Sequence, residues 1–155
     1  MAQEYLLAGD TIAGTEGRLT AIIRGNIETL LHIRKIEAKI EKNKEDMKVI
    51  GFRGKQTKAV GFTGSGEMEA YIGNPLFTEI MEQYTRNGID TYFNILISTH
   101  DKTSQVGEQS VLLLGVNLDE TIISKLDAEE SMLTETIPFT FNDFQLTKKF
   151  NRLNY

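Results

Sequence analysis

The sequence predicts a largely β fold with one helix. Three observations favour it: the chain has 13 Gly but 2 Pro, apolar and polar residues alternate over several stretches, and one stretch has clear helical periodicity. With 155 residues, 40% apolar and 25% charged, the composition is that of one domain, residues 1–155, around a single core. We expect an N-terminal arm over 1–13 and a C-terminal tail over 145–155.

The helix is predicted over residues 75–87. Pro75 suits a first helical position, Asn74 precedes it as a cap, and Asn87-Gly88 ends it. The apolar stripe consists of Leu76, Phe77, Ile80, Met81 and Tyr84. On the opposite side, Glu79, Glu82 and Gln83 are expected to face solvent.

Strands are predicted over 91–98 and 110–118, joined by a polar loop as a long antiparallel hairpin. A third strand lies around 137–142, at an edge or starting near Pro138, which cannot donate a ladder hydrogen bond. In the N-terminal half, a strand over 19–23 precedes the turn Gly25-Asn26.

Residues 31–40 alternate with a one-residue slip at Arg34-Lys35, which predicts a β-bulge. A helix over 27–42 is the alternative, because Ile33, Ile36 and Ile40 also fit helical spacing. The uninterrupted alternation of residues 36–41 favours a strand.

Residues 45–66 are predicted to form a protruding hairpin. Two alternating stretches, 46–52 and 56–63, flank Arg53-Gly54-Lys55. Apolar residues occur on both of its faces: Met47, Val49, Ile50, Phe52, Val60 and Phe62. Such a hairpin is a candidate for burial against another subunit, and these six residues are the candidate subunit interface. The alternative is that it folds over the chain's own core.

Composition excludes several kinds of site. The chain has no Cys, and its two His, at 32 and 100, have no partner at ligand spacing, so no metal site is expected. The glycines of Gly61–Gly66 precede a strand-like segment rather than a helix, so no cofactor-binding loop is expected. His32 fits an outward strand position. We expect no catalytic residue, no cofactor and no membrane segment.

Charge is unevenly distributed along the chain. The net charge is 17 − 22 = −5, which argues against a dedicated nucleic-acid binder. Residues 41–58 hold six basic and three acidic side chains, whereas residues 119–136 hold six acidic and one basic. The acidic stretch is a candidate recipient for the basic one.

Five clusters carry a resemblance to a known family: residues 14–19, 37–44, 50–51, 63–66 and 137–144. In order and spacing they resemble the tail tube protein of PBSX-like defective phages, a family found in contractile myophage tails and in R-type bacteriocins such as diffocin-type particles. The most specific parts are Glu41-Lys42-Asn43-Lys44 and Pro138-Phe139-Thr140-Phe141-Asn142-Asp143-Phe144.

The resemblance implies a β-sandwich or half-barrel subunit that forms stacked hexameric rings with a central channel. The hairpin would carry ring-to-ring contacts, and Glu79, Glu82 and Gln83 would face the tail sheath. Baseplate and terminator proteins would be further partners, and DNA would pass without specific binding. Assembly would occur in the host cytoplasm, and the mature site would be a phage tail or an extracellular bacteriocin particle.

Two other functions fit the residues less well. One is the tube of a non-contractile tail or a secretion-system ring protein. The other is a small β-barrel ligand-binding module, which would require a monomer with an apolar cavity.

Overall fold

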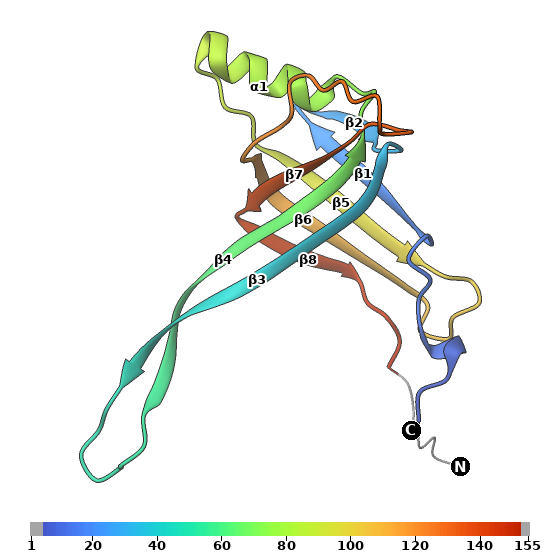
Figure 1. Ribbon diagram of the computed structural model, residues 1–155. Helices are drawn as coiled ribbons and strands as arrows, with labels where there is room; N and C mark the ends of the chain where they lie inside the picture. Colours follow the sequence, from blue (N-terminus) through green and yellow to red (C-terminus); the bar gives the residue numbers. More distant parts are fainter. Residues whose placement is uncertain (1–4, 153–155) are drawn as a thin grey trace.

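The computed structural model describes residues 5–152. Within them the chain forms eight strands, one α-helix and one 3-10 turn, η1 (Ala8–Asp10). The strands are β1 (Gly17–Ile23), β2 (Asn26–Thr29), β3 (Ile33–Met47), β4 (Gln56–Tyr71), β5 (Phe93–His100), β6 (Glu108–Leu118), β7 (Thr134–Phe141) and β8 (Asp143–Lys148), and the helix is α1 (Leu76–Asn87). The predicted mainly β fold with one flanking helix is confirmed (Figure 1).

The strands pair antiparallel in the order β2-β1-β5-β6-β7-β4-β3, with β8 added to β6. Strand β6 joins the two halves of this arrangement. Its first part, Ser110–Leu114, pairs with β8, while Asn117 and Leu118 at its end pair with β7. The two halves therefore face each other as layers of a bent sheet, and β6 is shared between them (Figure 1).

The core lies between these layers, and α1 covers one end of it. Both layers and the helix contribute fully or nearly fully buried side chains: Ala21, Ile95 and Leu113, then Met68, Ile137 and Phe139, then Phe77 and Ile80. The rings of Phe77 and Phe93 stack at 6.5 Å between centroids, which fixes the helix on β5.

The helix ends as the sequence predicts, but it begins one residue later than the predicted start at Pro75: α1 starts at Leu76, and Pro75 is its N-cap residue. The Leu76 N–H donates to Asn74 Oδ1 at 3.0 Å, so the Asn74 side chain satisfies the first backbone donor of the helix. Gly88 adopts φ +69° and its N–H donates to Tyr84 O at 2.9 Å. Tyr84 itself was wrongly placed on the buried stripe: it is exposed, because the last turn of α1 extends beyond the sheets (Figure 1).

The strand interpretation of residues 31–40 is confirmed. The β3–β4 register shifts between Ile33 and Lys35, where the bulge was expected, and no helix forms over 27–42. Residues 46–52 were wrongly predicted as a continuous strand. Strand β3 ends at Met47, and residues 48–55 form the connecting loop, in which Gly51 has φ +92°. The left-handed turn interrupts the alternation.

Three further positions differ from expectation. β7 is not an edge strand and does not start near Pro138, since it begins at Thr134, pairs with β4 along its length and pairs with the end of β6 through Phe139 and Thr140. The Pro138 carbonyl faces the end of β6, where it accepts a hydrogen bond from Asp119 N–H at 2.9 Å. Because the nitrogen and the carbonyl of one strand residue point to the same side, the Pro138 nitrogen, which has no hydrogen to donate, faces away from β4. The pairing of β7 with β4 therefore loses no hydrogen bond at Pro138. His32 does not point outward: it is half-buried, and its ring packs on Phe77 at 5.7 Å.

The segment from residue 145 onward, expected as a tail, begins with the remainder of β8. Its register pairs Leu146 with Val111 and Phe144 with Leu113. Residues 1–4 of the expected N-terminal arm and residues 153–155 of the expected tail lie outside the described residues.

A corner at Gly115 lets β6 pass from β8 to β7. Gly115 has φ +66°, and its N–H donates to Asn94 Oδ1 at 3.2 Å. The Asn142 N–H donates to Leu114 O at 2.9 Å, which places the turn between β7 and β8 directly beside this corner. A Cβ at Gly115 would overlap the Asn142 side chain.

We expect Gly115→Ala to destabilise the subunit by about 2 kcal/mol or more, because alanine strains a left-handed backbone and crowds Asn142. Urea denaturation measures the free energy of unfolding. Gly73→Ala is the matched control, since a Cβ at Gly73 meets nothing within 4 Å and its backbone is not left-handed. Equal stability of the two variants would contradict the role of the corner.

Asp101 ties the N-terminal segment to the β5–β6 loop. Its Oδ1 accepts from Thr103 N–H at 2.9 Å and from Thr103 Oγ1 at 2.6 Å, while Oδ2 accepts from Ala13 N–H at 3.0 Å. These bonds, the Thr103 side chain's first, lower the pKa of the carboxyl below its ordinary value of 3.8.

Because this pKa is lowered on folding, the charged carboxylate stabilises the fold above pH 3.8, and the contribution is lost as pH falls through the lowered pKa. We therefore expect wild type to be more stable than Asp101→Asn at neutral pH and the difference to shrink in acid. Urea titrations of both proteins over a pH series provide the measurement, and a difference independent of pH would refute the assignment.

Candidate functional site

A hairpin projects from the body without a third strand beside it. β7 pairs with β4 only from Gly64 onward, so the β3–β4 pairs from Glu41↔Thr63 to Met47↔Gln56 stand alone. We call residues 41–63 the projecting hairpin (Figure 1). The seven β3 positions from Glu41 to Met47 extend it by roughly 20 Å before the loop.

Few side-chain contacts add to the backbone ladder of the projecting hairpin. Lys55 Nζ lies 2.9 Å from Asp46 Oδ2, and Asn43 Nδ2 donates to Thr63 Oγ1 at 3.3 Å. All of its residues are exposed. A two-stranded ribbon without a packed face is marginal in water.

The six candidate interface residues all lie on it and are all exposed. Their exposed fractions are 43% for Met47, 42% for Val49, 106% for Ile50, 56% for Phe52, 56% for Val60 and 52% for Phe62. They form two groups, because Met47, Val49, Ile50 and Phe52 belong to the tip, whereas Val60 and Phe62 lie on β4. The alternative in which this hairpin folds over the chain's own core is therefore wrong.

A groove of about 350 Å³ lies between the projecting hairpin and β8. Its lining is largely apolar and consists of Ile40, Lys42, Ala59, Gly61, Phe62, Asp143 and Phe144. Of these, Phe62 was predicted as an interface residue. Ile40 and Phe144 were not predicted to lie beside Phe62. Phe144 reaches the hairpin only because β8 pairs with β6.

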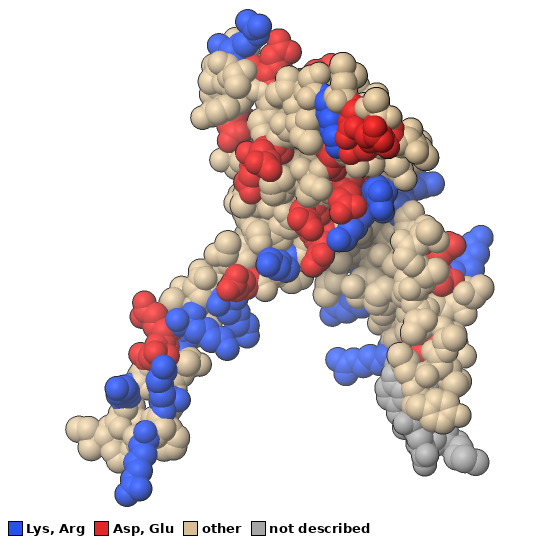
Figure 2. Space-filling view, viewed as in Figure 1, with Lys and Arg blue, Asp and Glu red and all other residues tan. Residues whose placement is uncertain are grey.

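Basic and acidic side chains gather at opposite ends of the subunit. The projecting hairpin has six basic and three acidic residues. The β6–β7 connection, residues 119–133, has five acidic residues and one lysine, and we call it the acidic loop. Figure 2 shows Lys and Arg along the projecting hairpin, while Asp and Glu dominate much of the other end.

The three candidate sheath-facing residues are placed differently from one another. Glu79 and Glu82 are exposed on α1, and Glu82 pairs with Arg86 at 3.2 Å. Gln83 is half-buried, and its Oε1 accepts from Arg24, which also donates to Thr91 Oγ1 at 3.1 Å. Gln83 is thus bound within its own subunit, whereas the side chains of Glu79 and Glu82 are exposed to solvent.

The described residues contain no group of three or more His, Asp or Glu side chains placed to hold a metal ion. No helix within residues 5–152 is long and apolar enough to cross a membrane. A second groove, of about 680 Å³, opens between β1 and the start of β3, with mixed lining that includes Arg18, Arg34 and Leu31.

The sequence of this chain is similar to those of known tail tube and phage-like element proteins. The family model described as "Phage tail tube protein" matches residues 4–148. The phage-like element PBSX protein XkdM of Bacillus subtilis (strain 168) is 36% identical over 146 residues, which cover 94% of this chain and 97% of XkdM.

Two solved assemblies share the fold. A chain of the anti-feeding prophage tube-terminating cap matches with a TM-score of 0.69 and 11% identity, over 95% of this chain and 94% of that one. A chain of the sheath-tube complex of an extracellular contractile injection system in its extended state matches with a TM-score of 0.67 and 8% identity, over 88% and 91%. The chain belongs to the phage tail tube protein family.

Proposed function

We propose that this tail tube subunit forms hexameric rings that stack into the inner tube of a contractile phage tail or R-type bacteriocin, around a central channel. The observation that carries the proposal is the projecting hairpin, whose two faces expose apolar side chains that the subunit does not cover. The six candidate interface residues on it would make the contact between rings.

Free strand edges support lateral closure into a ring. Within residues 5–152, β2 pairs only with β1, β3 only with β4, and β8 only with β6. Long unpaired edges invite uncontrolled association, and closing several subunits into a ring removes them. Such a ring contact joins two different edges, whereas the stacking contact is open-ended and propagates a tube.

The face of α1 that carries Glu79 and Glu82 would point outward to the sheath. Phe77 and Ile80 are already used in the core, so polar side chains remain for the sheath. Exposed ion pairs contribute little free energy each, which suits a contact that a contracting sheath must release.

The net charge of −5 is consistent with a channel that lets DNA pass without binding it. Assembly would take place in the host cytoplasm, with sheath, baseplate and terminator proteins as partners. Catalysis has no place in this function.

We expect Val60→Asp combined with Phe62→Asp to block tube growth and leave the monomer folded. Both side chains are more than half exposed in the subunit, and each aspartate would place a charge in the desolvated contact at a cost of roughly several kcal/mol. Negative-stain images of concentrated protein report tubes, and circular dichroism reports the fold. If the variant forms normal tubes, Val60 and Phe62 are not part of the contact between rings.

Reversing two charges on α1, Glu79→Lys with Glu82→Lys, should leave the tube intact and weaken only assembly of the sheath around it. The reason is that both side chains are exposed on the face turned away from the core. The readout is co-sedimentation of sheath protein with preformed tubes. Loss of the tube itself would show that α1 lies in a contact between tube subunits.

A further inference from the structure

The acidic loop exposes apolar side chains at the end of the subunit away from the projecting hairpin. Four of its apolar side chains are open to solvent: Ile122 at 39%, Ile123 at 68%, Leu126 at 95% and Met132 at 67%. The same loop has five carboxylates, so exposed apolar side chains and negative charges lie close together on it. This combination marks a protein contact rather than a solvated turn.

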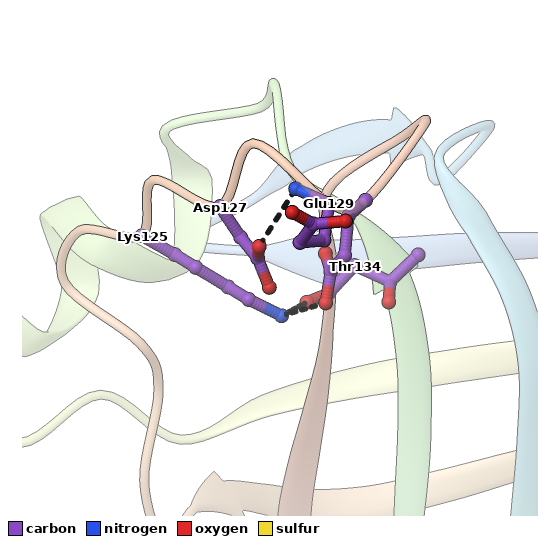
Figure 3. Close-up of polar contacts among 5 residues, drawn as sticks. Lys125, Asp127, Glu129 and Thr134 are labelled. Atoms are coloured by element: carbon purple, nitrogen blue, oxygen red, sulfur yellow. Dashed lines mark hydrogen bonds and ion pairs between the residues drawn. The ribbon is translucent and has the colours of Figure 1, made fainter.

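Internal bonds hold the acidic loop in one shape (Figure 3). Lys125 Nζ lies 2.7 Å from Glu130 Oε1 and donates to Thr134 O at 3.2 Å. Asp127 Oδ1 accepts from Glu129 N–H at 3.0 Å. A loop ordered before binding loses less conformational entropy when it docks.

These bonds expose Leu126, and most carboxylates of the acidic loop remain without an ion pair within residues 5–152. Leu126 stands between Lys125 and Asp127, each bonded back to the loop, so its side chain is held out into solvent. The only lysine of the loop is paired with Glu130. Among residues 5–152, the carboxylates of Asp119, Glu120, Asp127 and Glu129 make no ion pair.

The matching surface is the inner face of the projecting hairpin, which looks toward β8. Cross-strand partners share a face, so Lys42 with Phe62 and Lys44 with Ala59 lie on this side. Lys42, Ala59 and Phe62 also line the groove against Phe144. Neither lysine has an ion pair within the described chain. This face is apolar and basic where the acidic loop is apolar and acidic.

The two surfaces lie at opposite ends of one subunit. The acidic loop runs beside α1, while the projecting hairpin and β8 diverge from the other end of the body (Figure 1). A subunit therefore cannot satisfy both surfaces by itself. Copies stacked head to tail bring the loop of one to the groove of the next, and the contact repeats without closing.

We propose that the acidic loop of one copy docks into the groove between the projecting hairpin and β8 of the next copy along the tube, with Leu126 as its apolar anchor. Lys42 and Lys44 face its unpaired carboxylates. This inference rests on the proposed stacking of rings and names the surface that receives the hairpin. Complementary charge fixes the polarity and the register of the stack.

Two charge-reversed proteins test the pairing. One carries Glu120→Lys and Glu129→Lys, which leaves the bonds of Lys125 and Asp127 in place; the other carries Lys42→Glu and Lys44→Glu. Each alone should raise the concentration needed for tube formation by about tenfold or more, because attraction becomes repulsion. An equimolar mixture should assemble, since the acidic hairpin of one then meets the basic loop of the other.

Sedimentation and negative-stain imaging measure assembly, and circular dichroism with thermal melting checks that each variant is folded. The control is Glu79→Lys with Glu82→Lys, which changes the net charge by the same amount as the loop variant and should assemble like wild type. Leu126→Ser tests the apolar anchor separately, and it should weaken assembly without altering the monomer's melting temperature.

The outcomes separate this inference from the proposed function. Wild-type protein that forms no tubes under any condition would overturn the stacking itself. Wild-type tubes together with normal tubes from the loop variant and from Leu126→Ser would overturn only the docking surface. Variants that fail alone and also fail when mixed would likewise contradict the pairing of loop with hairpin.

Discussion

The structure depends on one long antiparallel ladder, β3 with β4, of which only one part is covered. From Gly64 to Tyr71, β4 also pairs with β7 and contributes Met68 and Ala70 to the core. Over residues 41–63, between Gly64 and the tip, the same two strands have no third strand beside them within the described chain, and both faces of the ribbon are exposed to solvent. A lone ribbon cannot bury its apolar side chains within the subunit, and this is the reason for proposing that another subunit covers them.

The junction between the covered and projecting parts is closely packed. A Cβ at Gly64 would collide with the ring of Phe141, and one at Gly66 would collide with the ring of Phe139. Aromatic side chains of β7 thus lie directly against the β4 backbone where the hairpin leaves the body. This packing fixes the direction of the hairpin relative to the core.

Separation of charge gives the subunit a polarity that a uniform surface would lack. An acidic protein overall, it concentrates lysine and arginine on the projecting hairpin and carboxylates on the loop at the other end. In the proposed stack, this long-range attraction would orient subunits before contact, whereas exposed apolar side chains such as Phe62 and Leu126 would supply affinity only at short range. Salt would weaken the first effect far more than the second.

Local signals in the sequence determined the elements whose cause is local. The ends of α1 follow from the side chain of Asn74 and the left-handed Gly88, and the bulge near Arg34 follows from a slip in alternation. The hairpin's exposed apolar residues were also predicted, since a ribbon with apolar side chains on both faces shows this pattern without knowledge of its neighbours.

Other features were decided by contacts between residues far apart in the chain. β8 became a strand because β6 offers it an edge, and Phe144 entered the groove only through that pairing. Gln83 accepts a hydrogen bond from Arg24, which lies 59 residues away in the sequence, and the ring of His32 packs on Phe77. Periodicity reports which face of an element is apolar, but it does not report which partner the fold brings to that face; that choice belongs to the tertiary structure.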